Sequence, residues 1–126
     1  MNSSYKYLYP FEKLRVWQEA RIFVKEIYIL TNTYPDIESL GLVSQMRRAV
    51  ISVSSNLEEG TTRTSKKEQA RFSNIAYGSL MEIINQLTIS VDLTYIKEEI
   101  FIQMKPKLTL LSNRINKLRK SQLKEK

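Results

Sequence analysis

The chain has 126 residues, of which 42% are hydrophobic and 26% are charged, as expected for one soluble globular domain. It contains no histidine and no cysteine, which excludes Ser-His-Asp and Cys-His catalytic groups, disulfides and zinc sites with nitrogen and sulfur ligands. No apolar run reaches the roughly 20 residues of a membrane-spanning helix, and the N-terminus lacks a signal-peptide pattern. We therefore predict a cytoplasmic protein with no membrane partner.

The formal net charge of +7 is concentrated near the C-terminus. Residues 1–102 contain twelve basic and twelve acidic side chains, whereas residues 103–126 contain eight basic side chains and one acidic side chain. A localised basic block predicts a polyanionic partner, with RNA or DNA as the first candidate. The alternative is a solvated, lysine-rich tail that only aids solubility.

The first predicted element is an extended arm over residues 1–10, because Pro10 disfavours helix at Tyr9. A helix is predicted from about Glu12 to Thr33, where apolar residues recur at helical spacing. A second apolar stripe runs beside the first and consists of Trp17, Val24 and Tyr28. Two stripes exceed what one bundle interior needs, so we predict that the second stripe is an interface between copies of the chain.

The next two helices are predicted from about Gly41 to Glu59 and from about Lys66 to Leu93. Gly60 is predicted to end the first of these with a positive φ. Ser65 and Glu68 are predicted to form a capping box at the start of the second. Gly78 interrupts this helix, and we predict that it allows another helix to approach closely.

A last helix is predicted from about Lys97 to Lys120, where apolar residues keep a regular heptad rhythm. Pro106 falls inside this pattern and predicts either a kink or the first turn of a helix that begins later. Four helices with short connections predict an all-α, antiparallel up-down four-helix bundle over residues 11–120. Residues 121–126 are predicted to form a basic C-terminal tail.

Catalytic chemistry has little support in the sequence. The paired carboxylates are Glu58-Glu59 and Glu98-Glu99, and adjacent residues on a helix do not face one another. Three scattered glycines cannot build a phosphate-binding loop. We therefore predict that the protein is not an enzyme and uses no metal or cofactor.

A polar stripe on the second predicted helix faces polar residues of the third. The hairpin places Arg48 opposite the region of Glu82, so the two side chains are candidates for an interhelical ion pair. The whole candidate set is Gln45, Arg48, Ser52, Asn56, Ser79, Glu82 and Gln86. We interpret it as a structural network that sets helix register, with a ligand pocket as the alternative, and predict that Arg48→Ala lowers the melting temperature or disrupts the oligomer. Arg47 projects about 100° away from Arg48 and is predicted to have a different role.

Basic residues form two groups of candidates for nucleic-acid binding. They are Arg63, Lys66, Lys67 and Arg71 near the turn between the second and third helices, and Lys105, Lys107, Arg114, Lys117, Arg119 and Lys120 on the last helix. Cations at a helix start oppose the helix dipole, which favours a use beyond stability, such as phosphate contact. A basic bundle would recognise charge and shape more than base sequence.

Three blocks of residues carry a family resemblance over about residues 11–96. They are Phe11-Glu-Lys-Leu-Arg-Val-Trp17-Gln-Glu-Ala20; Gln45-Met-Arg-Arg-Ala49 with Ser55-Asn-Leu-Glu-Glu-Gly60; and Phe72 with Gly78-Ser79, Glu82 and Gln86-Leu87. In these blocks the chain resembles the four-helix-bundle proteins encoded in intervening sequences of bacterial 23S rRNA genes. It departs from them at Glu58, where the family usually has a small residue.

The resemblance implies a ring-like homopentamer of antiparallel bundles without established enzymatic activity. It also extends to the accessory variability proteins of diversity-generating retroelements, which are basic pentamers that bind a reverse transcriptase and nucleic acid. We therefore expect a homo-oligomeric, RNA-associated binding module. The alternative is a structural or protein-interaction scaffold, such as an adaptor for a reverse transcriptase.

Overall fold

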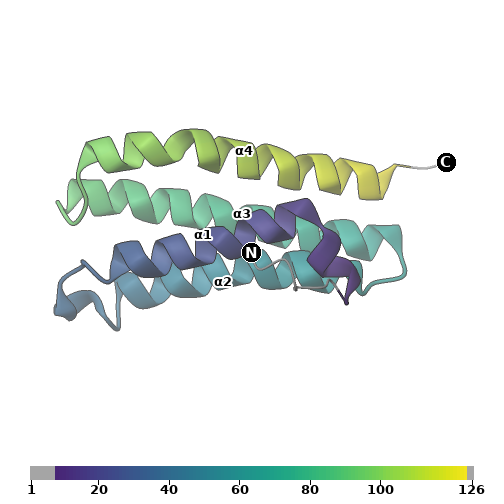
Figure 1. The fold of residues 1–126 in the computed structure, drawn as a ribbon, viewed down its shortest axis with the longest axis horizontal. Coiled ribbons are helices and arrows are strands. Elements are labelled where there is room, and N and C mark those ends of the chain that lie inside the picture. Colours follow the sequence, from purple (N-terminus) through teal and green to yellow (C-terminus); the bar gives the residue numbers. More distant parts are fainter. Residues whose placement is uncertain (1–7, 125–126) are drawn as a thin grey trace.

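The computed structural model describes residues 8–124, which form four long helices and two short 3-10 turns, with no strand in this range. The turns are η1 (Pro10–Lys13) and η2 (Asp36–Glu38), and the helices are α1 (Arg15–Thr31), α2 (Leu42–Thr61), α3 (Lys66–Asp92) and α4 (Glu98–Leu123). Successive helices run in opposite directions and lie side by side (Figure 1). The predicted all-α four-helix arrangement is confirmed.

The helices do not pack equally on one another. The most extensive contacts join α2 to α3 and α3 to α4, whereas α1 touches α4 at few positions. One apolar face of every helix is buried between them, including Phe23 and Ile27 of α1, Met46 of α2, Leu80 of α3 and Ile115 of α4. Each such side chain contributes about 1.5–3 kcal/mol by leaving water. None of the helices in residues 8–124 is both long and apolar enough to cross a membrane.

The first helix begins three residues later than predicted. Glu12 belongs instead to η1, where its carboxylate accepts hydrogen bonds from the backbone N–H groups of Leu8 (3.0 Å) and Tyr9 (2.9 Å). Leu14 then adopts an extended conformation with φ −76° and ψ 113°, and α1 starts after it. Residues 1–7 of the predicted arm lie outside the described residues.

The roles predicted for Gly60 and Gly78 are both wrong. No glycine in the described chain has a positive φ, and α2 continues through Gly60 to Thr61. Gly60 is buried against α3, where an added Cβ would lie 3.4 Å from the carbonyl oxygen of Gln69 and 3.5 Å from the Cβ of Phe72. Gly78 is exposed, and an added Cβ there would meet no atom within 4 Å. Gly60, not Gly78, therefore lies against a neighbouring helix.

Gly78→Ala should stabilise the protein. The methyl group fits open space, and replacing glycine by alanine in a helix interior raises the free energy of unfolding by about 0.5–1 kcal/mol. Urea denaturation would measure the gain. Gly60→Ala is the matched control, and its gain should be smaller because the methyl group must pack against α3. A larger gain for Gly60→Ala than for Gly78→Ala would contradict this account.

The last helix extends beyond its predicted bounds at the C-terminal side. Pro106 lies inside α4. The predicted alternative of a helix that begins only near Pro106 is therefore wrong. The helix continues to Leu123, and Lys124 caps it, so residues 121–123 are helical. Residues 125 and 126 lie outside the described part of the chain.

Candidate nucleic-acid interface

Two basic clusters that are distant in sequence meet at one end of the bundle. The turn between α2 and α3 and the C-terminus of α4 lie at the same end (Figure 1). Lys66 Nζ donates to the carbonyl oxygen of Lys124 (3.1 Å), and Ser73 Oγ donates to Gln122 Oε1 (2.6 Å). We call this surface the basic end; its cations are Arg63, Lys66, Lys67, Arg71, Lys117, Arg119, Lys120 and Lys124.

The start of α3 sets the positions of the first cluster. Ser65 Oγ accepts a hydrogen bond from the backbone N–H of Glu68 (3.0 Å), which confirms the predicted cap residue. The Glu68 carboxylate does not complete a capping box, because it accepts hydrogen bonds from Arg71 Nε (3.0 Å) and Nη2 (3.2 Å). These bonds hold the pKa of Glu68 below its ordinary value. Arg71 is thereby fixed on the surface of α3 with part of its charge balanced.

Phe72 positions two guanidinium groups at the basic end. The Cζ atoms of Arg63 and Arg71 lie 4.7 Å and 4.6 Å from the centre of its ring. Arg63 also forms an exposed ion pair with Glu59 (3.0 Å). Exposed ion pairs contribute about 0–1 kcal/mol, so both arginines can exchange a carboxylate for a phosphate at little cost.

Three of the ten predicted cations lie away from the basic end. Lys107 pairs with Glu26 and Arg114 pairs with Glu19, so both link α4 to α1. Lys105 lies over the ring of Phe101, at 5.0 Å from its centre. The acidic partners on α1 are about 80 to 95 residues earlier in the chain, and the sequence pattern did not reveal them.

The other seven predicted cations lie at the basic end. The side chains of Lys67, Lys117 and Lys120 are exposed and form no hydrogen bond or ion pair with any described residue. Arg119 is half-buried and reaches Asn74 Oδ1 at 3.5 Å. The three free ammonium groups are the charges most available to a polyanion.

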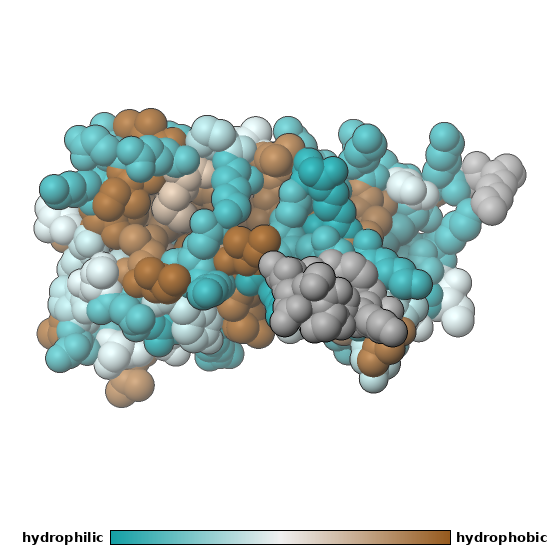
Figure 2. Space-filling view, in the orientation of Figure 1, coloured by the Kyte–Doolittle hydropathy of each residue, from teal (hydrophilic) through white to brown (hydrophobic). Residues whose placement is uncertain are grey.

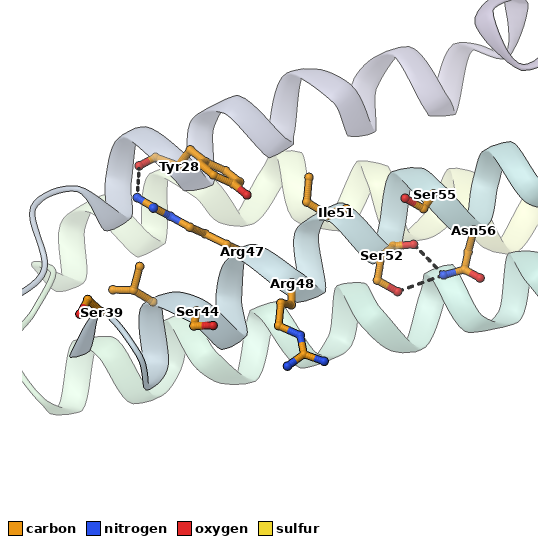
Figure 3. A pocket seen from close by; sticks show the side chains of 10 residues that line it. Tyr28, Ser39, Ser44, Arg47, Arg48, Ile51, Ser52, Ser55 and Asn56 are labelled. Atoms are coloured by element: carbon orange, nitrogen blue, oxygen red, sulfur yellow. Dashed lines mark hydrogen bonds between the residues drawn. The ribbon is translucent and has the colours of Figure 1, made fainter. Parts of the chain in front are cut away.

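On α2, Arg47 has a structural role that sequence analysis did not identify. Its Nε donates to Thr31 Oγ1 (3.0 Å), and its Nη2 donates to the carbonyl oxygen of Tyr28 (3.3 Å) and to Asn32 Oδ1 (2.9 Å). Its guanidinium also lies 4.5 Å from the centre of the Tyr28 ring (Figure 3). A cation at the C-terminus of α1 satisfies carbonyl groups that the helix itself leaves without donors.

Arg48 points away from Arg47, toward the α3 side of α2 (Figure 3). It is exposed, and the predicted ion pair with Glu82 is absent; Glu82 instead accepts a hydrogen bond from Gln86 Nε2 (3.3 Å). Both charges are accessible to water, so hydration replaces the ion pair at little cost. The side chain of Gln45 is also exposed and likewise forms no hydrogen bond with a described residue.

One hydrogen bond within the predicted polar set connects α2 to α3. The hydroxyl groups of Ser52 and Ser79 are 2.8 Å apart, and Asn56 Nδ2 donates to both the carbonyl oxygen (2.8 Å) and the Oγ (3.0 Å) of Ser52. Arg48 lies between two open hollows of about 620 Å³ and about 370 Å³, the first bordered by Tyr28 and the second by Glu82. Residues 8–124 contain no group of three or more acidic side chains that could hold a metal.

The predicted interface residues on α1 are only partly accessible. Trp17 packs edge-on against Phe11, with ring centres 4.9 Å apart, and Val24 is half-buried against the core. Tyr28 is partly exposed beneath Arg47. Their role as an interface stays a prediction.

More strongly exposed apolar residues of α1 were missed by sequence analysis. Ile22 and Ile29 are 57% and 58% exposed, and Leu110 of α4 is 46% exposed. Ile22 and Leu110 border a small hollow between α1 and α4, and apolar side chains gather between these helices in Figure 2. We call Ile22, Ile29 and Leu110 the α1–α4 seam. If the apolar residues on every side of α1 had been counted, and not only those in two stripes, the sequence could have indicated Ile22 and Ile29.

Comparison with known proteins gives one family match. The family model described as 23S rRNA-intervening sequence protein matches residues 12–117. None of the curated proteins compared with the chain matches it. The matched range covers α1, α2, α3 and most of α4, and it extends beyond the blocks that carried the resemblance. Arg119, Lys120 and Lys124 lie outside it.

Proposed function

The chain belongs to the 23S rRNA-intervening sequence protein family, and on this premise we propose that it is a non-enzymatic, cytoplasmic module that binds structured RNA through its basic end. The observation that carries the proposal is the convergence of two basic clusters, one from the α2–α3 turn and one from α4, on the same surface. Neither cluster alone covers this surface.

The physical basis of such binding is release of counterions from phosphates. Each cation that neutralises a phosphate steepens the salt dependence of the association constant, with a slope of about −0.7 to −0.9 per contact. The basic end consists of helix termini and a short turn, with Phe72 covered by two arginines instead of open for base stacking. Recognition should therefore follow charge and backbone shape more than base sequence.

The triple variant Lys67→Ala/Lys117→Ala/Lys120→Ala should weaken binding of duplex RNA about 10- to 100-fold and reduce the salt slope by about 2 to 3. The side chains of these lysines form no hydrogen bond or ion pair with a described residue, so their loss should leave the fold intact. Fluorescence anisotropy between about 50 and 200 mM salt would measure both quantities.

The matched control is Lys25→Ala/Lys97→Ala/Lys105→Ala, which removes the same charge from exposed lysines elsewhere. It should change the affinity far less than the basic-end variant. If the two triple variants lose affinity equally, the attraction depends on net charge, and the basic end is not the binding surface.

We also propose that the protein is a homo-oligomer, with the pentamer of the family resemblance as the expected size. Support comes from the α1–α4 seam, whose apolar side chains face solvent along the weakest helix contact of the bundle. Light scattering in high salt should give about five times the chain mass of 14.8 kDa. Ile22→Glu/Leu110→Glu should reduce the mass toward one chain, whereas Ile89→Glu on α3 should not. A wild-type protein that scatters as a single chain would refute this proposal.

A protein-interaction scaffold, such as an adaptor for a reverse transcriptase, is the second candidate function. The exposed apolar seam favours it, because apolar surface of this kind is typical of protein contacts. Weak RNA binding that is unchanged in the basic-end triple variant would favour this candidate over RNA binding.

A further inference from the structure

The bundle carries opposite charges at its two ends. Opposite the basic end, the α1–α2 and α3–α4 connections lie close together (Figure 1). Five carboxylates lie in these connections or at the helix ends beside them, where Lys97 is also found and Arg47 is hydrogen-bonded to Asn32. We call these carboxylates the acidic end, and they are Asp36, Glu38, Asp92, Glu98 and Glu99. All except Glu38 are exposed and form no ion pair with a described residue. Their charge is therefore available to a partner.

Hydrogen bonds hold the two connections of the acidic end together. Glu38 accepts hydrogen bonds from Tyr95 Oη (2.7 Å) and from the backbone N–H of Leu42 (3.2 Å). The rings of Tyr34 and Tyr95 also pack with their centres 5.4 Å apart. The hydrogen bond from Tyr95 keeps the pKa of Glu38 below its ordinary value, so this carboxylate stays charged near neutral pH. Such a pre-formed surface loses little conformational freedom when a partner binds.

Apolar side chains project among the charges at both ends. Ile37 and Leu40 are 86% and 94% exposed, the highest values among large apolar residues of the described chain. At the basic end, Leu123 is 53% exposed beside Lys120 and Lys124. Charge therefore supplies attraction and specificity at each end, and contact between apolar side chains would add short-range stabilisation.

We propose that the acidic end of one copy docks on the basic end of another, so that copies of the protein stack end to end. The partner surface is on the same chain and has the complementary charge. Such a contact is head-to-tail, and it can add further copies because each stack retains one free acidic end and one free basic end. It is distinct from the lateral contact through the α1–α4 seam, and it goes beyond the proposed function because it assigns the acidic end a partner.

Stacking and RNA binding use the same surface. A polyanion on the basic end would exclude the acidic end of a neighbour, because both compete for the same cations. Duplex RNA should therefore disperse the stacks as it saturates the protein.

Charge reversal at each end tests the proposal directly. The acidic-end variant is Asp36→Lys/Asp92→Lys/Glu99→Lys. The basic-end variant is Lys67→Glu/Lys117→Glu/Lys120→Glu/Lys124→Glu, which leaves four cations at the basic end against four new carboxylates, Glu59 and Glu68. Each variant alone presents like charges at both ends and should not stack. An equal mixture of the two should stack, because the reversed ends complement one another.

Sedimentation velocity without RNA at about 50 mM and about 500 mM salt would measure the effect. We expect the mass of the wild-type protein at low salt to be at least about twice its mass at high salt. Each variant alone should lose this increase, and the mixture should regain it. A wild-type mass that does not change with salt would overturn the proposal. So would a mixture that fails to regain the increase while circular dichroism shows both variants folded. Because no RNA is present, failure of the RNA proposal leaves these outcomes unaffected.

Discussion

Arg47→Ala should lower the free energy of unfolding by about 2–3 kcal/mol. The substitution removes three hydrogen bonds to the C-terminus of α1 and leaves the buried side chain of Thr31 with one donor fewer. A typical hydrogen bond contributes about 0.5–1.5 kcal/mol, and the lost cation–π contact with Tyr28 adds about 0.5–1 kcal/mol. Urea denaturation monitored by circular dichroism would measure the change.

Arg48→Ala is the matched control for this prediction. Arg48 is the next residue of the same helix, but its side chain is exposed and makes no hydrogen bond or ion pair with a described residue. Stability should therefore change by no more than about 0.5 kcal/mol. Equal losses in the two variants would contradict the assignment of Arg47 as the link between α1 and α2. If Arg48→Ala disrupts the oligomer without lowering stability, Arg48 lies at an interface between copies of the chain.

Removal of residues 103–126 should abolish cooperative unfolding. This segment contributes Leu108, Leu111 and Ile115 of α4, all of which are buried in the core. Truncating one such side chain to alanine costs about 2–5 kcal/mol, and a whole domain is stable by about 5–15 kcal/mol. Loss of all three, with exposure of the face of α3 that they cover, therefore exceeds the stability available.

Thermal melts followed by circular dichroism would measure the effect of this truncation. A chain that ends after Lys120 is the control, since it keeps every buried residue of α4. It loses the terminal turn with the Ser73–Gln122 and Lys66–Lys124 hydrogen bonds. It should melt cooperatively within a few degrees of the full chain. An unchanged cooperative transition in the longer truncation would show that α4 is dispensable for the core. Point substitutions at the basic end are thus the sound way to test RNA binding.

The sequence by itself determined the number of helices, their order and most of their buried faces. Apolar spacing is a local property, and it identifies residues such as Phe23, Met46 and Leu80 wherever the helices finally pack. The N-cap at Ser65 was also readable, since it depends on a hydrogen bond within three residues. The family followed from the residue blocks, and the family match over residues 12–117 confirms it.

Only the tertiary structure decided which polar groups meet across helices. Arg47 reaches α1 and Arg48 reaches no partner, although the two are adjacent in the chain. The sequence does not distinguish Lys107 and Arg114 from the cations of the basic end. The structure does, because each forms an ion pair with a carboxylate of α1. Likewise, the close approach to a neighbouring helix that was predicted for Gly78 occurs at Gly60. The physical reason is that such pairings depend on the axial register and rotation of packed helices, which local periodicity does not specify.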